Sequence, residues 1–248
     1  MSGHSKWSTI KRAKGKTDAA RSAVFTKIGR EIAVAVKSGG ADPDSNSALR
    51  TVIAKAKAAN MPNDNINRSI KKASGELGNI NYESVVYEGY GTNGVAVIVE
   101  TLTDNKNRTA GDVRHLFDKF GGSMGTNGCV SYLFSSKGVI DIEKKNGMDD
   151  DEVMMAALEA GAEDFNADDD CYEIVTSTED FLNVCDGLRA AGYELADSRL
   201  DKIPSITVAL DDAAAEKLMK MLDALEENDD VQNVYHNADL PDTDDEEE

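Results

Sequence analysis

The side chains best suited to chemistry are the cations near the N-terminus. Eight lysines and arginines fall between Gly3 and Arg30 against one acid, Asp18, and the only tryptophan, Trp7, lies among them. Cationic groups bind phosphate and an aromatic ring stacks on a base, so this combination is typical of a nucleic-acid contact. The candidate nucleic-acid-binding residues are Lys6, Trp7, Lys11, Arg12, Lys14, Lys16, Arg21, Lys27 and Arg30.

Plainer interpretations of this segment stay open. A run of charge is often only a solubilising terminus. Trp7 could pack on the chain's own helices instead of on a base. The first alternative is weakened because the excess of cations continues onto the outward faces of the helices that follow.

The charge of the whole chain makes the basic end more informative. Residues 1–75 carry fifteen Lys and Arg against five Asp and Glu, a net of +10, whereas the remainder carries twelve against 41, a net of −29. A segment that opposes the charge of its own chain usually meets a partner of the other sign. The sign changes near Gly75, where we expect a domain boundary.

Other motifs give no support for a cofactor, a metal ion or catalysis. Residues 89–94 match GxGxxG, but a strand follows where a dinucleotide site needs a helix, so we expect a turn. The segment 164–168 resembles the start of an EF-hand loop, but the required glycine and glutamate positions hold Asp169 and Val175. His4, His115 and His236 have no partner at ligand or triad spacing. We therefore expect a protein that is not an enzyme.

The length and the cysteines limit the class of protein. A chain of 248 residues is long enough for more than one compact unit. Its three cysteines are odd in number and form no CxxC pair, which indicates a reducing cytoplasm rather than a disulfide framework or a zinc site. No apolar run approaches the ~18 residues of a membrane span, and no signal peptide is visible.

The spacing of apolar residues predicts three short helices after a flexible arm that ends near Lys16. The first runs from Thr17 or Asp18 to about Lys37, with Val24, Ile28, Ile32 and Ala35 on one face. A second starts near residues 45–47, and a third covers residues 64–73. Their outward faces are basic.

After Gly75 the pattern changes to alternating strands and helices. Strands are predicted at 85–87, 95–101, 129–134, 139–143, 171–176, 194–200, 206–210 and 231–235, with helices at 103–120, 150–160, 179–191 and 211–226. We predict an α+β chain with an N-terminal three-helix domain and two ferredoxin-like α/β domains, one inserted in the other. The predicted boundaries are 1–79, 80–136 with 203–240, 137–202 for the insertion, and 241–248 for an acidic disordered tail.

Several stretches resemble the YebC/PmpR family. They are SGHSKW at Ser2–Trp7, IK at Ile10–Lys11, GG–DP at Gly39–Pro43, NMP at Asn60–Pro62, YEGYG at Tyr87–Gly91, ETLTDNKNRT at Glu100–Thr109 and VRHLFDKFGG at Val113–Gly122. The likeness extends to about Leu240. Thr92 stands where the family more often has proline, and the acidic tail looks peculiar to this chain.

The resemblance implies a cytoplasmic protein of one helical and two α/β domains. It also implies a DNA-binding transcriptional regulator, although relatives such as the mitochondrial translational activator of cytochrome oxidase act at or near the ribosome. Two hypotheses follow. One is a regulator that grips DNA phosphates, and the other is a ribosome-associated translation factor that binds rRNA.

Overall fold

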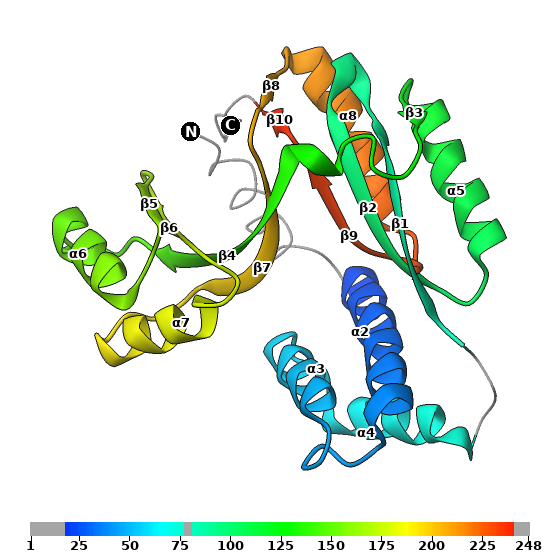
Figure 1. The fold of residues 1–248 in the computed structure, drawn as a ribbon, viewed down its shortest axis with the longest axis horizontal. Coiled ribbons are helices and arrows are strands. Elements are labelled where there is room, and N and C mark those ends of the chain that lie inside the picture. The colour runs from blue at the N-terminus through cyan, green and yellow to red at the C-terminus, as the bar shows by residue number, and fades with distance from the viewer. Residues whose placement is uncertain (1–17, 77–80, 241–248) are drawn as a thin grey trace. The chain divides into compact units, whose positions relative to one another are not determined.

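The computed structural model describes residues 18–76 and 81–240, in which an N-terminal helical region precedes two four-stranded antiparallel sheets with helices of their own. The arm predicted for residues up to Lys16 and the tail predicted for 241–248 lie outside the described residues. Contacts divide the described residues into two compact units: 18–76, 81–130 and 213–236 form one, and 131–212 with 237–240 form the other (Figure 1). The chain is therefore of mixed α+β class.

The helical region consists of α2 (Asp18–Gly39), α3 (Ser47–Ala58), α4 (Asn63–Lys71) and a π-helical turn (Lys72–Glu76). These elements share a core that contains Ile28, Ile32, Leu49, Ala56 and Ile66. The predicted apolar stripe of the first helix is confirmed at Ile28, Ile32 and Ala35, but Val24 is 43% exposed. Asn46 starts α3 because its side-chain oxygen accepts a hydrogen bond from the Leu49 amide at 3.0 Å.

The first sheet has the strand order β3-β1-β2-β9, and all its pairs are antiparallel. Its strands are β1 (Glu83–Tyr90), β2 (Ala96–Thr103), β3 (Ser123–Met124) and β9 (Val231–His236). Helix α5 (Lys106–Lys119) connects β2 to β3, and α8 (Asp212–Glu226) precedes β9. The pairing of β9 with β2 therefore brings the C-terminal part of the chain to a sheet that begins at residue 83.

Two glycines of the GxGxxG motif let helices approach this sheet closely. A Cβ atom at Gly89 would lie 2.7 Å from the Phe117 ring of α5, and one at Gly91 would lie 3.1 Å from Leu218 of α8. A Cβ at Gly89 would also lie 2.5 Å from the Ser123 backbone oxygen, so only glycine fits there, whereas at Gly91 the Leu218 side chain would have to shift slightly. The expected turn is confirmed at Asn93 and Gly94, which have φ angles of 55° and 79° and lead into β2. The motif therefore serves packing and a turn.

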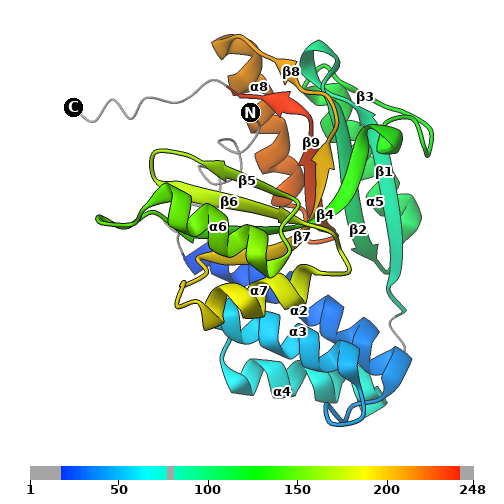
Figure 2. The same cartoon turned by 60° about the vertical axis from the view of Figure 1, so that its left-hand side comes forward.

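The second sheet has the order β5-β6-β4-β7 and is also antiparallel. In chain order its elements are β4 (Phe134–Glu143), α6 (Asp150–Ala160), β5 (Asp164–Ala167), β6 (Cys171–Thr176), α7 (Phe181–Ala190) and β7 (Asp197–Pro204). Figure 2 shows α6 and α7 on one face of the sheet, where Tyr172, Ile174 and Leu188 are buried in the core.

Three predicted strands differ from the structure: the strand predicted at 194–200 is shifted to β7 at Asp197–Pro204, and two others are largely absent. Residues 129–133 form no strand, because the buried Glu88 carboxylate accepts the Gly128 and Val130 amides at 2.8 and 2.9 Å and a 3₁₀ turn (Ser131–Leu133) follows. The predicted strand 206–210 is only β8 (Val208–Ala209), and it pairs with β10 (Ala238–Asp239) in a separate two-stranded sheet. The spacing of apolar residues cannot predict hydrogen bonds between a distant carboxylate and backbone amides.

Candidate nucleic-acid interface

The nine predicted binding residues all fall between positions 6 and 30 of the sequence. Lys6, Trp7, Lys11, Arg12, Lys14 and Lys16 lie outside the described residues. Arg21 belongs to α2, but only its backbone position is described. Lys27 and Arg30, also on α2, are described with their contacts. The prediction that these nine residues bind nucleic acid stays a prediction.

Lys27 and Arg30 both contact other elements of their own unit. The Lys27 ammonium donates a hydrogen bond of 2.7 Å to the backbone oxygen of Glu226, the last residue of α8. A cation at the C-terminal end of a helix is favoured by the helix dipole. The Arg30 guanidinium donates to the Leu102 oxygen at 2.9 Å and pairs with Asp230. Both side chains thus join α2 to the sheet and its covering helix.

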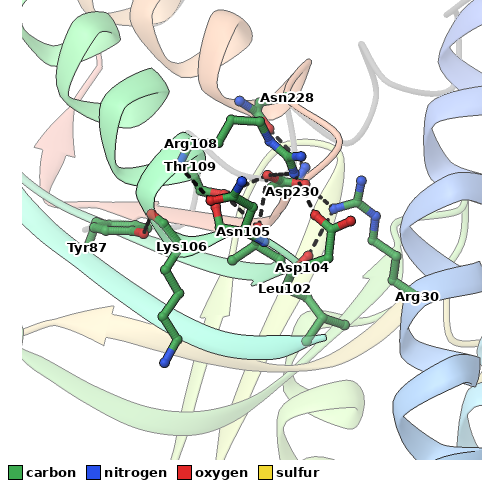
Figure 3. Close-up of polar contacts among 11 residues, drawn as sticks. Arg30, Tyr87, Leu102, Asp104, Asn105, Lys106, Arg108, Thr109, Asn228 and Asp230 are labelled. Atoms are coloured by element: carbon green, nitrogen blue, oxygen red, sulfur yellow. Dashed lines mark hydrogen bonds and ion pairs between the residues drawn. The ribbon is translucent and has the colours of Figure 1, made fainter. Parts of the chain in front are cut away.

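Asp230 is the centre of this contact (Figure 3). Its side chain is 4% exposed and accepts hydrogen bonds from Arg108 at 2.7 Å and from Thr109 at 2.6 Å, besides that from Arg30. Burial opposes ionisation, but these donors outweigh it and lower the pKa of Asp230 to about 2. Asp230 is therefore charged at neutral pH and neutralises part of the positive charge of two arginines.

Other cations of the helical region are better placed to meet a partner. Arg68, Lys71 and Lys72 are exposed, and none of them forms an ion pair within residues 18–76 and 81–240. Their spacing of three and four residues makes them neighbours on one helical surface. We name this trio the α4 basic face. Lys55, in contrast, is paired with Glu31 at 2.7 Å.

The α4 basic face was detectable from the sequence. The apolar residues Ile66 and Ile70 fix which side of α4 faces inward, and the three cations fall on the other side. Arg68, Lys71 and Lys72 are not among the predicted binding residues, because the density of positive charge is highest near the N-terminus. A partner binds to charged side chains that form no ion pair within the folded chain. The sequence alone does not show which ion pairs form.

The described residues also bear on metal binding and covalent chemistry. Nowhere in the described ranges do three or more His, Cys, Asp or Glu side chains gather so as to hold a metal ion. Burial and nearby carboxylates raise the pKa of Cys171 to about 12, so its thiol is protonated at neutral pH and a poor nucleophile. Among these same residues, no helix combines the length and apolar character that crossing a bilayer requires.

Comparison with known proteins shows the family to which the chain is similar. A model of the TACO1/YebC protein N-terminal domain matches residues 5–76, and a model of the TACO1/YebC second and third domain matches residues 82–238. Proteins from Clostridium botulinum and Acetivibrio thermocellus, each named a probable transcriptional regulatory protein, are both 60% identical to this chain. The alignments cover 97% and 96% of this chain and 98% of each relative.

A solved structure is similar over nearly the same length. The crystal structure of a conserved hypothetical protein from Aquifex aeolicus is 45% identical to this chain and superposes with a TM-score of 0.79. The match covers 92% of this chain and 93% of that protein.

Proposed function

The chain belongs to the TACO1/YebC family, and from that premise we propose that it is a DNA-binding regulator of transcription that contacts phosphates through its basic N-terminal region. Its relatives from C. botulinum and A. thermocellus carry the names of probable transcriptional regulatory proteins, not of enzymes. The observation that carries the proposal is the α4 basic face, whose three exposed cations have no ion-pair partner among the described residues. A cytoplasmic location belongs to the same proposal.

The mode of contact is electrostatic rather than sequence-reading. Lysine and arginine side chains that neutralise phosphates release counterions, which supplies affinity for any sequence. The arm residues Lys6 to Lys16 would add further contacts, and Trp7 would stack on a base. Arg30 is not expected to contact a phosphate, because its guanidinium already pairs with Asp230.

The finer domain arrangement is part of the proposal. We infer a helical domain over 1–79, a split domain over 80–136 and 203–240, and an inserted domain over 137–202. The elements of the insertion follow one another as strand, helix, strand, strand, helix and strand, and the strands lie in the sheet in the order β5-β6-β4-β7. This arrangement supports a ferredoxin-like fold. The split domain has four antiparallel strands and two helices as well.

A second function is favoured by the charge step. The net charge of −29 on residues 76–248 would repel a long duplex that wrapped around the molecule. A ribosome-associated translation factor would need only its basic end to enter an rRNA-lined site, while the acidic part faced protein or solvent. This candidate shares the phosphate contacts of the first and differs in the partner.

One experiment separates the two candidates. The full chain is incubated in parallel with purified ribosomes and with promoter DNA, and its retention is measured by co-sedimentation and by filter binding. Site-preferring retention on promoter DNA alone supports the transcriptional regulator, and co-sedimentation alone supports the translation factor. Retention on neither partner contradicts both.

A further inference from the structure

A cavity of about 310 Å³ opens between α2, the π-helical turn after α4 and Tyr82, all within one compact unit. On α2 its wall is formed by Phe25, Gly29, Ala33 and Lys37, which are spaced by four residues and so share one face. Gly29 and Ala33 leave the hollow in the middle of this face. The volume is near the lower end of the ~300–1,000 Å³ range of small-ligand sites.

The lining of the cavity combines cations with aromatic rings. Arg30, Lys37 and Lys72 bring positive charge, and Phe25 and Tyr82 bring aromatic surface. The Arg30 guanidinium lies 5.4 Å from the centre of the Tyr82 ring and is held in turn by Asp230. Arg30, which Asp230 holds, therefore lies over the Tyr82 ring at the edge of the cavity.

The two kinds of side chain match the two ends of a nucleotide. Lys72 is exposed and makes no ion pair with a described residue, so its ammonium can neutralise a phosphate. The half-buried Phe25 and Tyr82 offer rings against which a base can lie. An apolar ligand would leave the cations unused, and a bare inorganic anion would leave the rings unused.

We propose that this cavity receives one unstacked nucleotide of a single strand, with its base against Phe25 and Tyr82 and its phosphate at Lys72. The proposal rests on the nucleic-acid binding proposed above and adds the place where a base is held. A base within a duplex is stacked on both sides and reaches such a cavity only if it is flipped out. A single strand is therefore preferred to a duplex.

The test uses the full chain and fluorescence anisotropy with a short labelled strand of mixed sequence, the same strand built from abasic nucleotides, and the matching duplex. Tyr82→Leu removes a ring, and Ala33→Leu fills the cavity. Both are expected to weaken binding of the base-bearing strand about tenfold, the loss of one base–aromatic stack, and to leave the abasic strand unaffected. Circular dichroism checks that both variants fold.

Matched lysine variants distinguish a phosphate contact at the cavity from a general effect of positive charge on binding. Lys72→Gln is expected to weaken both strands more than Lys57→Gln does, because Lys57 is an exposed lysine of α3 outside the cavity. If Tyr82→Leu and Ala33→Leu weaken both strands equally, or neither, the cavity holds no base and this inference fails while the proposed function stands.

Two further outcomes are decisive. No binding of any probe by the wild-type chain removes the proposed function and this inference together. Binding of free adenosine monophosphate that Tyr82→Leu abolishes, without affinity for the strand, would assign the cavity to a small molecule and overturn the inference.

Discussion

Asp230 carries its negative charge where water barely reaches it. The side chain is 4% exposed and receives hydrogen bonds from Arg30, Arg108 and Thr109. Its backbone takes part as well, since the Asp230 oxygen accepts the Leu102 amide at 2.7 Å. A buried charge needs such partners, because an unpaired one costs several kcal/mol. Asp230 therefore connects the loop before β9 to three elements of the same unit, α2, β2 and α5.

Asp230→Asn is expected to lower the free energy of unfolding by about 2–4 kcal/mol, because it leaves Arg30 and Arg108 without their buried carboxylate. Urea denaturation measures the loss. The matched control is Asp104→Asn, which removes the other carboxylate on Arg108. Asp104 is 40% exposed, so its loss is expected to cost less than about 1 kcal/mol. Equal losses in the two variants would show that burial gives Asp230 no special weight.

At the scale of elements, the second sheet concentrates acids on neighbouring strands. Asp141 of β4 lies directly opposite Glu173 of β6 and opposite Asp197 of β7. Arg199 pairs with Asp141 and, at 2.9 and 3.1 Å, with Asp197 and Asp201. Burial, followed by repulsion from Asp141, raises the pKa of Glu173 to about 7.

The sign of the resulting pH dependence follows from this shift. The ordinary pKa of Glu173 is 4.5, so between pH 4.5 and 7 the folded sheet holds a proton that the unfolded chain has released. The second sheet should accordingly lose stability as the pH rises through this window. Glu173→Gln is expected to remove the loss and to stabilise the sheet by about 1–3 kcal/mol at pH 8.

Amide hydrogen exchange on β4 and β6, compared between variant and wild type at each pH, measures this effect. Glu143→Gln is the control, since Glu143 is an exposed glutamate of the same sheet. An unchanged pH dependence in Glu173→Gln would mean that the carboxyl ionises in the folded sheet as it does in water.

At the scale of the whole molecule, the sequence predicts local structure well and distant pairing poorly. The spacing of Ile28 and Ile32 predicts α2. The change in the pattern of apolar residues after Gly75 predicts the alternating strands and helices that follow. The pairing of Arg30 with Asp230 spans 200 residues, and no local pattern signals it. The sequence places Arg68 and Lys71 on the outward face of their helix, but only the structure shows that they have no ion-pair partner among the described residues.

The charge step is a property of the whole chain, and it directs any approach to phosphate. Residues 1–75 carry a net +10 and the remainder −29, so a polyanion is attracted to the first part of the chain and repelled by the rest. Binding by cationic side chains releases counterions from the nucleic acid. Added salt makes this release less favourable, so the affinity must fall as the salt concentration rises.

The salt dependence of duplex DNA binding by the full chain therefore tests the central claim most directly. With roughly five phosphates neutralised at about −0.9 each on the log–log slope, a fourfold rise in salt is expected to weaken binding a few hundredfold. Replacing Arg68, Lys71 and Lys72 together by Gln should make the slope shallower, by up to about 2.7.

The matched control replaces Lys137, Lys144 and Lys145, which are ion-paired lysines of the second unit, and should leave the slope unchanged. We expect a steep slope that depends on the α4 basic face. An affinity that does not change with salt, or a slope that only the control triple reduces, would contradict it.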